Sequence, residues 1–333
     1  MIRVSAGTAQ VLGLLHIKCL ALPTTAYILI GEKCARDCGF CSRSRSSAAG
    51  ADFLSRVTWP AFPAAEVVER LRLAYLSGRV ARACLQVVHG RAAWNKARRV
   101  LEDISQACSI PVSVSCTAGV LEDIGSWFDA GAQRFGLALD AAAGEVFAAV
   151  KGGHWRPTLS LLYRAAEKWP GRISTHLIAG LGETDRDMIF RLQDMLQRNV
   201  TVGLFAFTPV KGTRLAGLRR PSLARYRRIQ AAYHLMKEYR LDAAGFCFDR
   251  DGNLANLGLG EEEARALLGD GRAFMTTGCP GCNRPFYNEH PGGDMYNYPR
   301  APGPREIEEA LRLVLAGEIP RAAGCARCGG ERA

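Results

Sequence analysis

The chain has 333 residues, of which 48% are hydrophobic and 23% charged, and its formal net charge is +11. This length allows one large barrel or two ordinary domains, and the composition is that of a soluble globular protein. No run of 18 uncharged apolar residues occurs, which excludes a membrane-spanning helix. The apolar N-terminal stretch is interrupted by His16 and Lys18 and lacks the features of a signal peptide, so we expect a cytoplasmic protein.

From residue 26 onward, strand-like and helix-like segments alternate. The strand-like runs are short and rich in Val, Ile, Leu and Phe, as expected for parallel strands that are buried on both faces. We predict strands at 26–31, 81–90, 111–119, 134–141, 172–182 and 201–210. We predict helices at 63–78, 96–108, 121–132, 159–171, 184–199 and 222–240. Six such units in a row indicate an α/β fold, either a parallel barrel or a doubly wound sheet.

The alternation stops near residue 245. Residues 245–258 have the pattern of a β-hairpin, with Asp251 and Gly252 at the turn. A segment rich in Gly, Pro and Asn follows, and its many aromatic residues predict an ordered, loop-rich cap that ends in a helix over 305–318. We therefore divide the chain into an N-terminal extension (1–25), a barrel (26–245) and a C-terminal cap (246–333).

Three of the twelve cysteines follow the first predicted strand. Cys34, Cys38 and Cys41 have C-x3-C-x2-C spacing, in a loop where α/β folds place their ligands. Clustered thiols without an export signal indicate metal binding in a reducing compartment. Three thiolates on a four-iron cluster leave one iron open for another ligand, whereas a closed structural site takes four. The alternatives are a zinc knuckle or three unrelated thiols.

This loop, with the aromatic residue Phe40 before its last cysteine, resembles the signature of the radical S-adenosylmethionine (SAM) superfamily. The resemblance implies a (β/α)6 partial TIM barrel with a [4Fe-4S] cluster on Cys34, Cys38 and Cys41. It implies that SAM chelates the open iron, that Phe40 lies in the cofactor site, and that one-electron cleavage gives methionine and a 5′-deoxyadenosyl radical.

Further segments resemble the biotin-synthase-like branch of this superfamily over residues 26–245. They are SVSCTAGVL, LALDAA, IAGLGET and FTPVKGT, in that order along the chain. The resemblance implies that the turn with Gly180 and Glu183 lies against the adenine of SAM, and it makes Arg156 a partner for the SAM carboxylate. A solvated surface role for Arg156 is the alternative. The Gly-Gly-Glu motif often found after the second strand is absent, because VVHGR stands there.

The remaining cysteines include two C-x2-C pairs in the cap, Cys279 with Cys282 and Cys325 with Cys328. Each pair can direct two sulfurs to one metal centre, so the two pairs predict an auxiliary iron–sulfur cluster, with zinc or free thiols as alternatives. Cys247 and Cys19 are further possible ligands. Cys84 and Cys116 align with two auxiliary-cluster positions of biotin synthase, but Ser174 occupies the third, so core thiols are the expected role for both.

The segment GCPGCNRPFYNEHPGGDMYNYPR is similar to the C-terminal motif of the two-component lipoyl synthases. That resemblance implies sulfur insertion into a protein-bound octanoyl chain, with the auxiliary cluster as the sulfur source. The partners it implies are an octanoylated acidic carrier (a lipoyl domain or an H-protein), a related second radical SAM protein, and an electron donor such as ferredoxin. A net charge of +11 suits an acidic carrier.

Two other functions stay open at this stage. One is another biotin-synthase-like radical reaction on a free small molecule. The other is a non-catalytic metal-binding protein that holds nucleic acid through its basic surface. Basic residues are not interleaved with aromatic residues in a dense block, so we expect no nucleic-acid partner.

Overall fold

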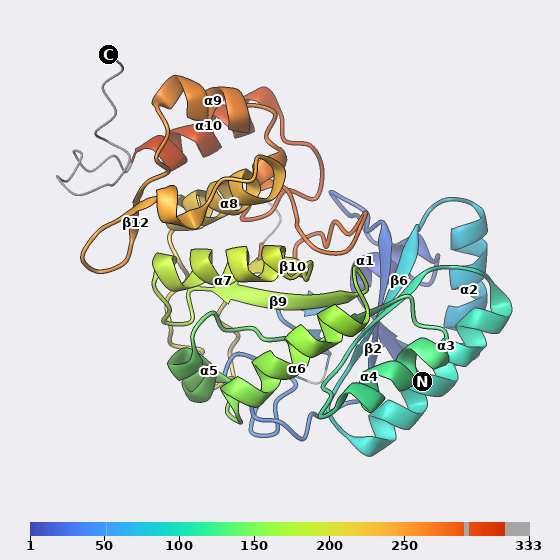
Figure 1. Cartoon of the computed structure of the whole chain (residues 1–333). Helices are drawn as coiled ribbons and strands as arrows, with labels where there is room; N and C mark the ends of the chain where they lie inside the picture. Colours follow the sequence, from blue (N-terminus) through green and yellow to red (C-terminus); the bar gives the residue numbers. More distant parts are fainter. Residues whose placement is uncertain (51, 290–292, 317–333) are drawn as a thin grey trace, which may run out of the picture.

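A mostly parallel sheet of eight strands forms the centre of the computed structural model, which describes residues 1–50, 52–289 and 293–316 (Figure 1). The strand order is β10-β9-β8-β7-β6-β2-β1-β5, and neighbours from β2 to β10 are parallel. The parallel strands are β2 (Thr25–Ile30), β6 (Arg82–Val87), β7 (Val112–Ser115), β8 (Arg134–Gly136), β9 (Ile173–Ala179) and β10 (Thr201–Ala206). All six predicted strands are therefore present.

Helices follow each parallel strand and cover the outside of the sheet (Figure 1). They are α2 (Ala64–Leu76), α3 (Arg91–Ala107), α4 (Leu121–Asp129), α5 (Gly144–Val150), α6 (Trp155–Lys168), α7 (Asp185–Gln197) and α8 (Leu223–Glu238). The predicted start at residue 184 has a local cause, because the Thr184 hydroxyl accepts the amide of Asp187 and caps α7. Six strand–helix units confirm the predicted (β/α)6 partial barrel.

Residues 1–25, which we predicted to be an extension, belong partly to the sheet. Strand β1 (Ile2–Val4) pairs antiparallel with both β2 and β5 (Ala61–Phe62). Helix α1 (Ala6–Val11) follows, with Ser5 as its N-cap. The short elements α1, α5 and α9 (Glu261–Leu268) have six to eight residues each, and such lengths give no sequence periodicity to recognise.

The C-terminal region after α8 consists of a hairpin, two helices and a segment that contacts the barrel strands. The hairpin of β11 (Cys247–Phe248) and β12 (Leu254–Asn256) turns at residues 249–253, as predicted. Helix α10 (Pro304–Leu315) packs against α8, and α9 packs against α10, on the outside of the barrel (Figure 1). Between them, residues 276–289 contact strands β2, β6, β7 and β10, so this segment is part of the barrel rather than a cover over it.

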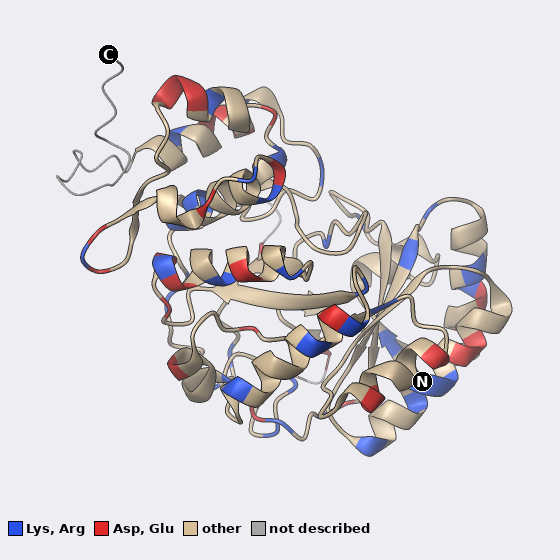
Figure 2. Ribbon diagram, viewed as in Figure 1, with Lys and Arg blue, Asp and Glu red and all other residues tan. Residues whose placement is uncertain are grey.

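Charge is spread over most of the elements. Figure 2 shows both basic and acidic residues on the helices around the sheet. Among the described residues, no helix has the length and apolar character that a membrane crossing requires.

Candidate active site

The first cysteine loop leaves the C-terminal end of β2 and is anchored by backbone hydrogen bonds. The amide of Cys34 donates to the Arg43 carbonyl at 2.8 Å, and the amide of Ala35 donates to the His89 carbonyl at 2.9 Å. Two sulfurs also accept backbone amides: Cys34 Sγ from His89 at 3.3 Å and Cys41 Sγ from Arg43 at 3.4 Å. The VVHGR segment after β6 therefore supports the cysteine loop through the backbone of His89.

Two of the three thiols lie in surroundings that disfavour their charged form. Burial raises the pKa of Cys38 to about 12, and nearby Lys151 opposes this shift. Burial also raises the pKa of Cys41 to about 11, against the hydrogen bond from Arg43. Within the described part of the chain, no three His, Cys, Asp or Glu side chains converge on a single ion position. A four-iron cluster takes one thiolate per iron, so the three thiols of this loop provide ligands for three of its irons.

A buried ion pair lies beside Cys38. Lys151 Nζ is 2.7 Å from Asp140 Oδ2, and it also donates to the carbonyl of Ala138. Asp140 is in the left-handed region, with φ of 66°, just beyond β8. Such strain is typical of functional positions, and neither residue was among our predicted site residues. The only local signal was that Asp140 is the one charged residue in the apolar LALDAA stretch.

The turn after β9 is organised by Glu183, whose side chain is fully buried. Its two oxygens accept the amides of Gly180 at 2.6 Å and Leu181 at 2.9 Å, and Arg225 contacts it at 3.1 Å. Burial raises the pKa of Glu183, and these hydrogen bonds oppose the rise. Gly180 has φ of 100°, and a Cβ there would be 2.8 Å from Pro221. Glu183 thus shapes the turn, and its contact with adenine stays a prediction.

The other two predicted cofactor residues lie in different surroundings. Phe40 is half-buried against the main hydrophobic core. Arg156 is exposed in the first turn of α6. Its role with the SAM carboxylate therefore also stays a prediction.

The middle of the barrel is lined by aromatic and polar side chains. His176 on β9 packs edge-on against Phe205 of β10, with ring centroids 5.2 Å apart. Burial lowers the pKa of His176 to about 4, so the ring is neutral at physiological pH. Gln86 of β6 donates to the hydroxyl of Tyr287 at 3.2 Å. Tyr287 comes from the segment 276–289, which shows that this segment reaches into the barrel.

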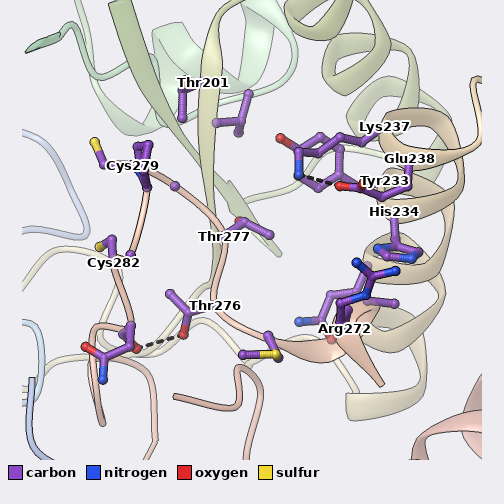
Figure 3. Close-up of a pocket in the computed structure, with 18 of the residues that line it drawn as sticks. Thr201, Tyr233, His234, Lys237, Glu238, Arg272, Thr276, Thr277, Cys279 and Cys282 are labelled. Atoms are coloured by element: carbon purple, nitrogen blue, oxygen red, sulfur yellow. Dashed lines mark hydrogen bonds and ion pairs between the residues drawn. The ribbon is translucent and has the colours of Figure 1, made fainter. Parts of the chain in front are cut away.

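The second cysteine pair lies at the opposite end of the barrel, near the N-terminal ends of the strands. Cys279 and Cys282 are in the loop beside a cavity of about 710 Å³. Thr201, Lys237 and Thr277 are among the residues that line this cavity. Figure 3 shows that both sulfurs project from the side of the loop that faces away from the α8 side chains.

The structure separates the remaining cysteines. Cys325 and Cys328, the predicted second pair, lie outside the described residues. Cys116 is buried in the main core between the sheet and its helices, in agreement with its predicted role as a core thiol. Cys84 differs, since it packs on the other side of the sheet with Tyr27 and Tyr287. Side chains along a strand alternate between the two faces, which explains the difference.

The comparisons with known proteins identify the family. A family model described as the radical SAM superfamily matches residues 28–195, about half of the chain. The chain belongs to the radical SAM superfamily. It is therefore a radical SAM enzyme that uses SAM and a [4Fe-4S] cluster. No curated protein matches the sequence.

Solved structures support the fold of this radical SAM enzyme. A structure of HydG, a maturase of the [FeFe]-hydrogenase, matches with a TM-score of 0.53 at 13% identity, over 65% of this chain and 50% of that one. Methylornithine synthase (PylB) matches with a TM-score of 0.50 at 15% identity, over 64% and 61%. The chain thus spans less than two thirds of either protein's length. At such identities, these likenesses show the shared barrel fold alone.

Proposed function

We propose that this radical SAM enzyme inserts sulfur into an octanoyl chain carried by an acidic protein, as one component of a two-protein lipoyl synthase. The observation that carries the proposal is the second pair of thiols, Cys279 and Cys282, at the end of the barrel opposite the first cysteine loop. A radical enzyme without a sulfur source needs only the first set. A second thiol set that contacts barrel strands fits a sulfur donor beside the substrate.

The chain's own residues would hold and isolate the reacting groups. Cys34, Cys38 and Cys41 would hold the [4Fe-4S] cluster, and Cys279 and Cys282 would hold the auxiliary cluster. With SAM and one electron from an external donor, the first cluster would provide the radical that removes one substrate hydrogen atom. The second would provide the sulfide that bonds to that carbon and would take up one electron in its iron. His176 and Phe205 pack edge to face in the barrel interior, where their rings would help to keep water from the radical. A neutral His176 places no charge beside an alkyl chain.

Exposed basic residues on the barrel rim near the first cysteine loop support the proposal that the substrate carrier is acidic. The loop over 207–220 packs on the cysteine loop, since the amide of Leu215 donates to the carbonyl of Gly39 at 2.8 Å. This rim loop has no acidic residue and exposes Lys211, Arg214 and Arg219. Exposed cations at the mouth would steer an acidic lipoyl domain or H-protein toward the radical site.

The test is anaerobic turnover of an octanoyl-lysyl lipoyl domain with SAM, a reductant such as ferredoxin, and a related second radical SAM protein. We expect mass spectrometry to show thiolated carrier. Cys38→Ala should abolish deoxyadenosine formation, whereas Cys279→Ala should retain it and lose thiolation. Thiolation by Cys279→Ala would show that this pair is not the sulfur site. Turnover of a free small molecule without a carrier would contradict the carrier-dependent function.

A further inference from the structure

A row of three barrel residues lies against the loop that carries Cys279 and Cys282. Register places Cys84 of β6 opposite Tyr27 of β2 on one side and Ser113 of β7 on the other. Residues in register on adjacent strands point to the same face of the sheet, so these three side chains are neighbours inside the barrel.

The two outer members of this row contact the two thiols of the cap. Cys282 Sγ is 3.2 Å from the hydroxyl of Tyr27, and the Ser113 hydroxyl is 3.8 Å from Cys279 Sγ. Cys84, which stands between Tyr27 and Ser113, therefore faces both cap thiols. Cys84 and Cys282 also pack against the same apolar group, which contains Tyr27 and Tyr287.

The loop that carries Cys279 and Cys282 is fixed to the strand ends. Arg82 donates to the carbonyl of Pro280 at 3.1 Å, and the Thr24 hydroxyl donates to the carbonyl of Gly281 at 2.5 Å. The amide of Thr24 also donates to Asn283 Oδ1 at 3.0 Å. These bonds hold the loop at both thiols, so their position beside Cys84 is built into the barrel.

All three cysteines are free thiols, and each is partly shielded from solvent. A polynuclear iron–sulfur cluster takes one thiolate per iron and stabilises deprotonated sulfur in a buried place. The donor set therefore fits this group.

We propose that Cys84, together with Cys279 and Cys282, holds the auxiliary iron–sulfur cluster inside the barrel. The inference deepens the proposed function, since it rests on that function for the cluster's role as sulfur donor. From the sequence we expected the two cap pairs alone to bind this cluster. In the proposed site, strand β6 and the cap share its ligands.

This site places the two thiol sets on opposite sides of a substrate. His89, whose amide contacts Cys34 Sγ, lies five positions after Cys84. At about 3.3 Å per residue of extended chain, this stretch spans at most roughly 17 Å. His176 lies between the two sets, since its carbonyl accepts the amide of Asp140 beside the first loop at 2.8 Å, and its ring packs on Phe205, on which Arg284 of the cap segment stacks. An alkyl chain between the two ends would meet the radical from one side and the sulfide from the other.

The experiment compares iron and sulfide content and electron paramagnetic resonance spectra of the full-length protein after anaerobic reconstitution. We expect about eight irons per chain in the wild type, and about four in Cys84→Ala and Cys279→Ala, with SAM cleavage retained in both. Cys116→Ala is the matched control, because it removes a buried thiol that faces the other side of the sheet, and it should keep about eight. Cys84→Ser keeps the side chain's size, so it should fold even where the alanine variant fails, and it should also lose the second cluster or alter its signal.

The outcomes separate this inference from the function on which it rests. Eight irons and an unchanged second signal in Cys84→Ser, with loss in Cys279→Ala, would overturn the role of Cys84 and leave sulfur insertion intact. About four irons in the wild type would overturn both. Loss of the second cluster in the Cys84 variants, together with a wild type that does not thiolate an octanoyl carrier, would support the site and contradict the substrate.

Discussion

Replacing Glu183 with Gln tests whether one buried carboxylate holds the turn after β9. Glu183 accepts two backbone amides and faces Arg225, and its side chain has no exposed surface. Glu183→Gln keeps the size of the side chain but turns an NH2 group toward one of these donors. A buried donor without an acceptor costs about 1–3 kcal/mol, and a hydrogen bond to a charged group contributes about 1.5–3 kcal/mol.

Two features of the structure make the expected loss of stability smaller than the sum of these two energies. Arg225 is 23% exposed and keeps Asp185 as a partner at 2.5 Å, so water and Asp185 replace part of the lost interaction. Burial raises the pKa of Glu183, which means that its charge is itself costly to bury. We therefore expect Glu183→Gln to lower the free energy of unfolding by about 3 kcal/mol, mostly through lost acceptor geometry.

The assay is urea unfolding of the reconstituted protein, followed by circular dichroism, with SAM affinity measured in parallel. Glu262→Gln is the control, because Glu262 is exposed on α9 and its substitution should change the free energy of unfolding by less than about 0.5 kcal/mol. SAM binding by Glu183→Gln should weaken, since the turn is predicted to lie against adenine. A loss below about 1 kcal/mol would refute the view that this carboxylate organises the turn.

Two further predictions concern the backbone of the cysteine loop and the interior of the barrel. At Gly31, φ is 96° and a Cβ would be 2.2 Å from Val88, so Gly31→Ala should lower the free energy of unfolding by roughly 3 kcal/mol or more and lower the iron content. At Gly78, φ is 70° and nothing lies within 4 Å of a Cβ, so Gly78→Ala should cost only about 1 kcal/mol of backbone strain. Equal losses of stability in urea unfolding would contradict the steric argument. His176 has a pKa of about 4 when folded and an ordinary value near 6.5 when unfolded, so the unfolded chain binds more protons between these values and stability falls as pH falls. From pH 7.5 to pH 5, His176 should remove about 2 kcal/mol of the wild type's free energy of unfolding. The His176→Phe variant should lack this loss, whereas His16→Phe, which replaces an exposed histidine, should retain it. Parallel stability profiles for the wild type and His176→Phe would contradict the low pKa of His176.

The sequence was a good guide wherever the signal is local. Cys34, Cys38 and Cys41 lie within eight residues, so their spacing alone indicated a shared centre. Helix α7 could be located from its periodicity and from the Thr184 cap, because both act within a few residues. The six strands are short apolar runs, and their regular alternation with helices predicted the barrel.

The sequence was a poor guide to the barrel's interior. It placed the segment 276–289 in a cap. In the structure, Arg284 of this segment donates to the carbonyl of Thr277 and stacks on Phe205 inside the barrel, with its guanidinium carbon 3.9 Å from the ring centroid. It also treated Cys84 and Cys116 alike. Their difference depends on which face of the sheet each residue occupies, and a strand that is apolar on both faces does not reveal this.

The sequence by itself thus determined the fold class, the first cysteine loop and the surplus of thiols, because each depends on residues that are near one another in the chain. Only the tertiary structure decided that Cys282 meets Tyr27, which is 255 residues away, and that Asp140 pairs with Lys151 beside Cys38. Contacts of this kind depend on strand register and on the path of a long loop. They arise when the barrel closes, and no local pattern encodes them.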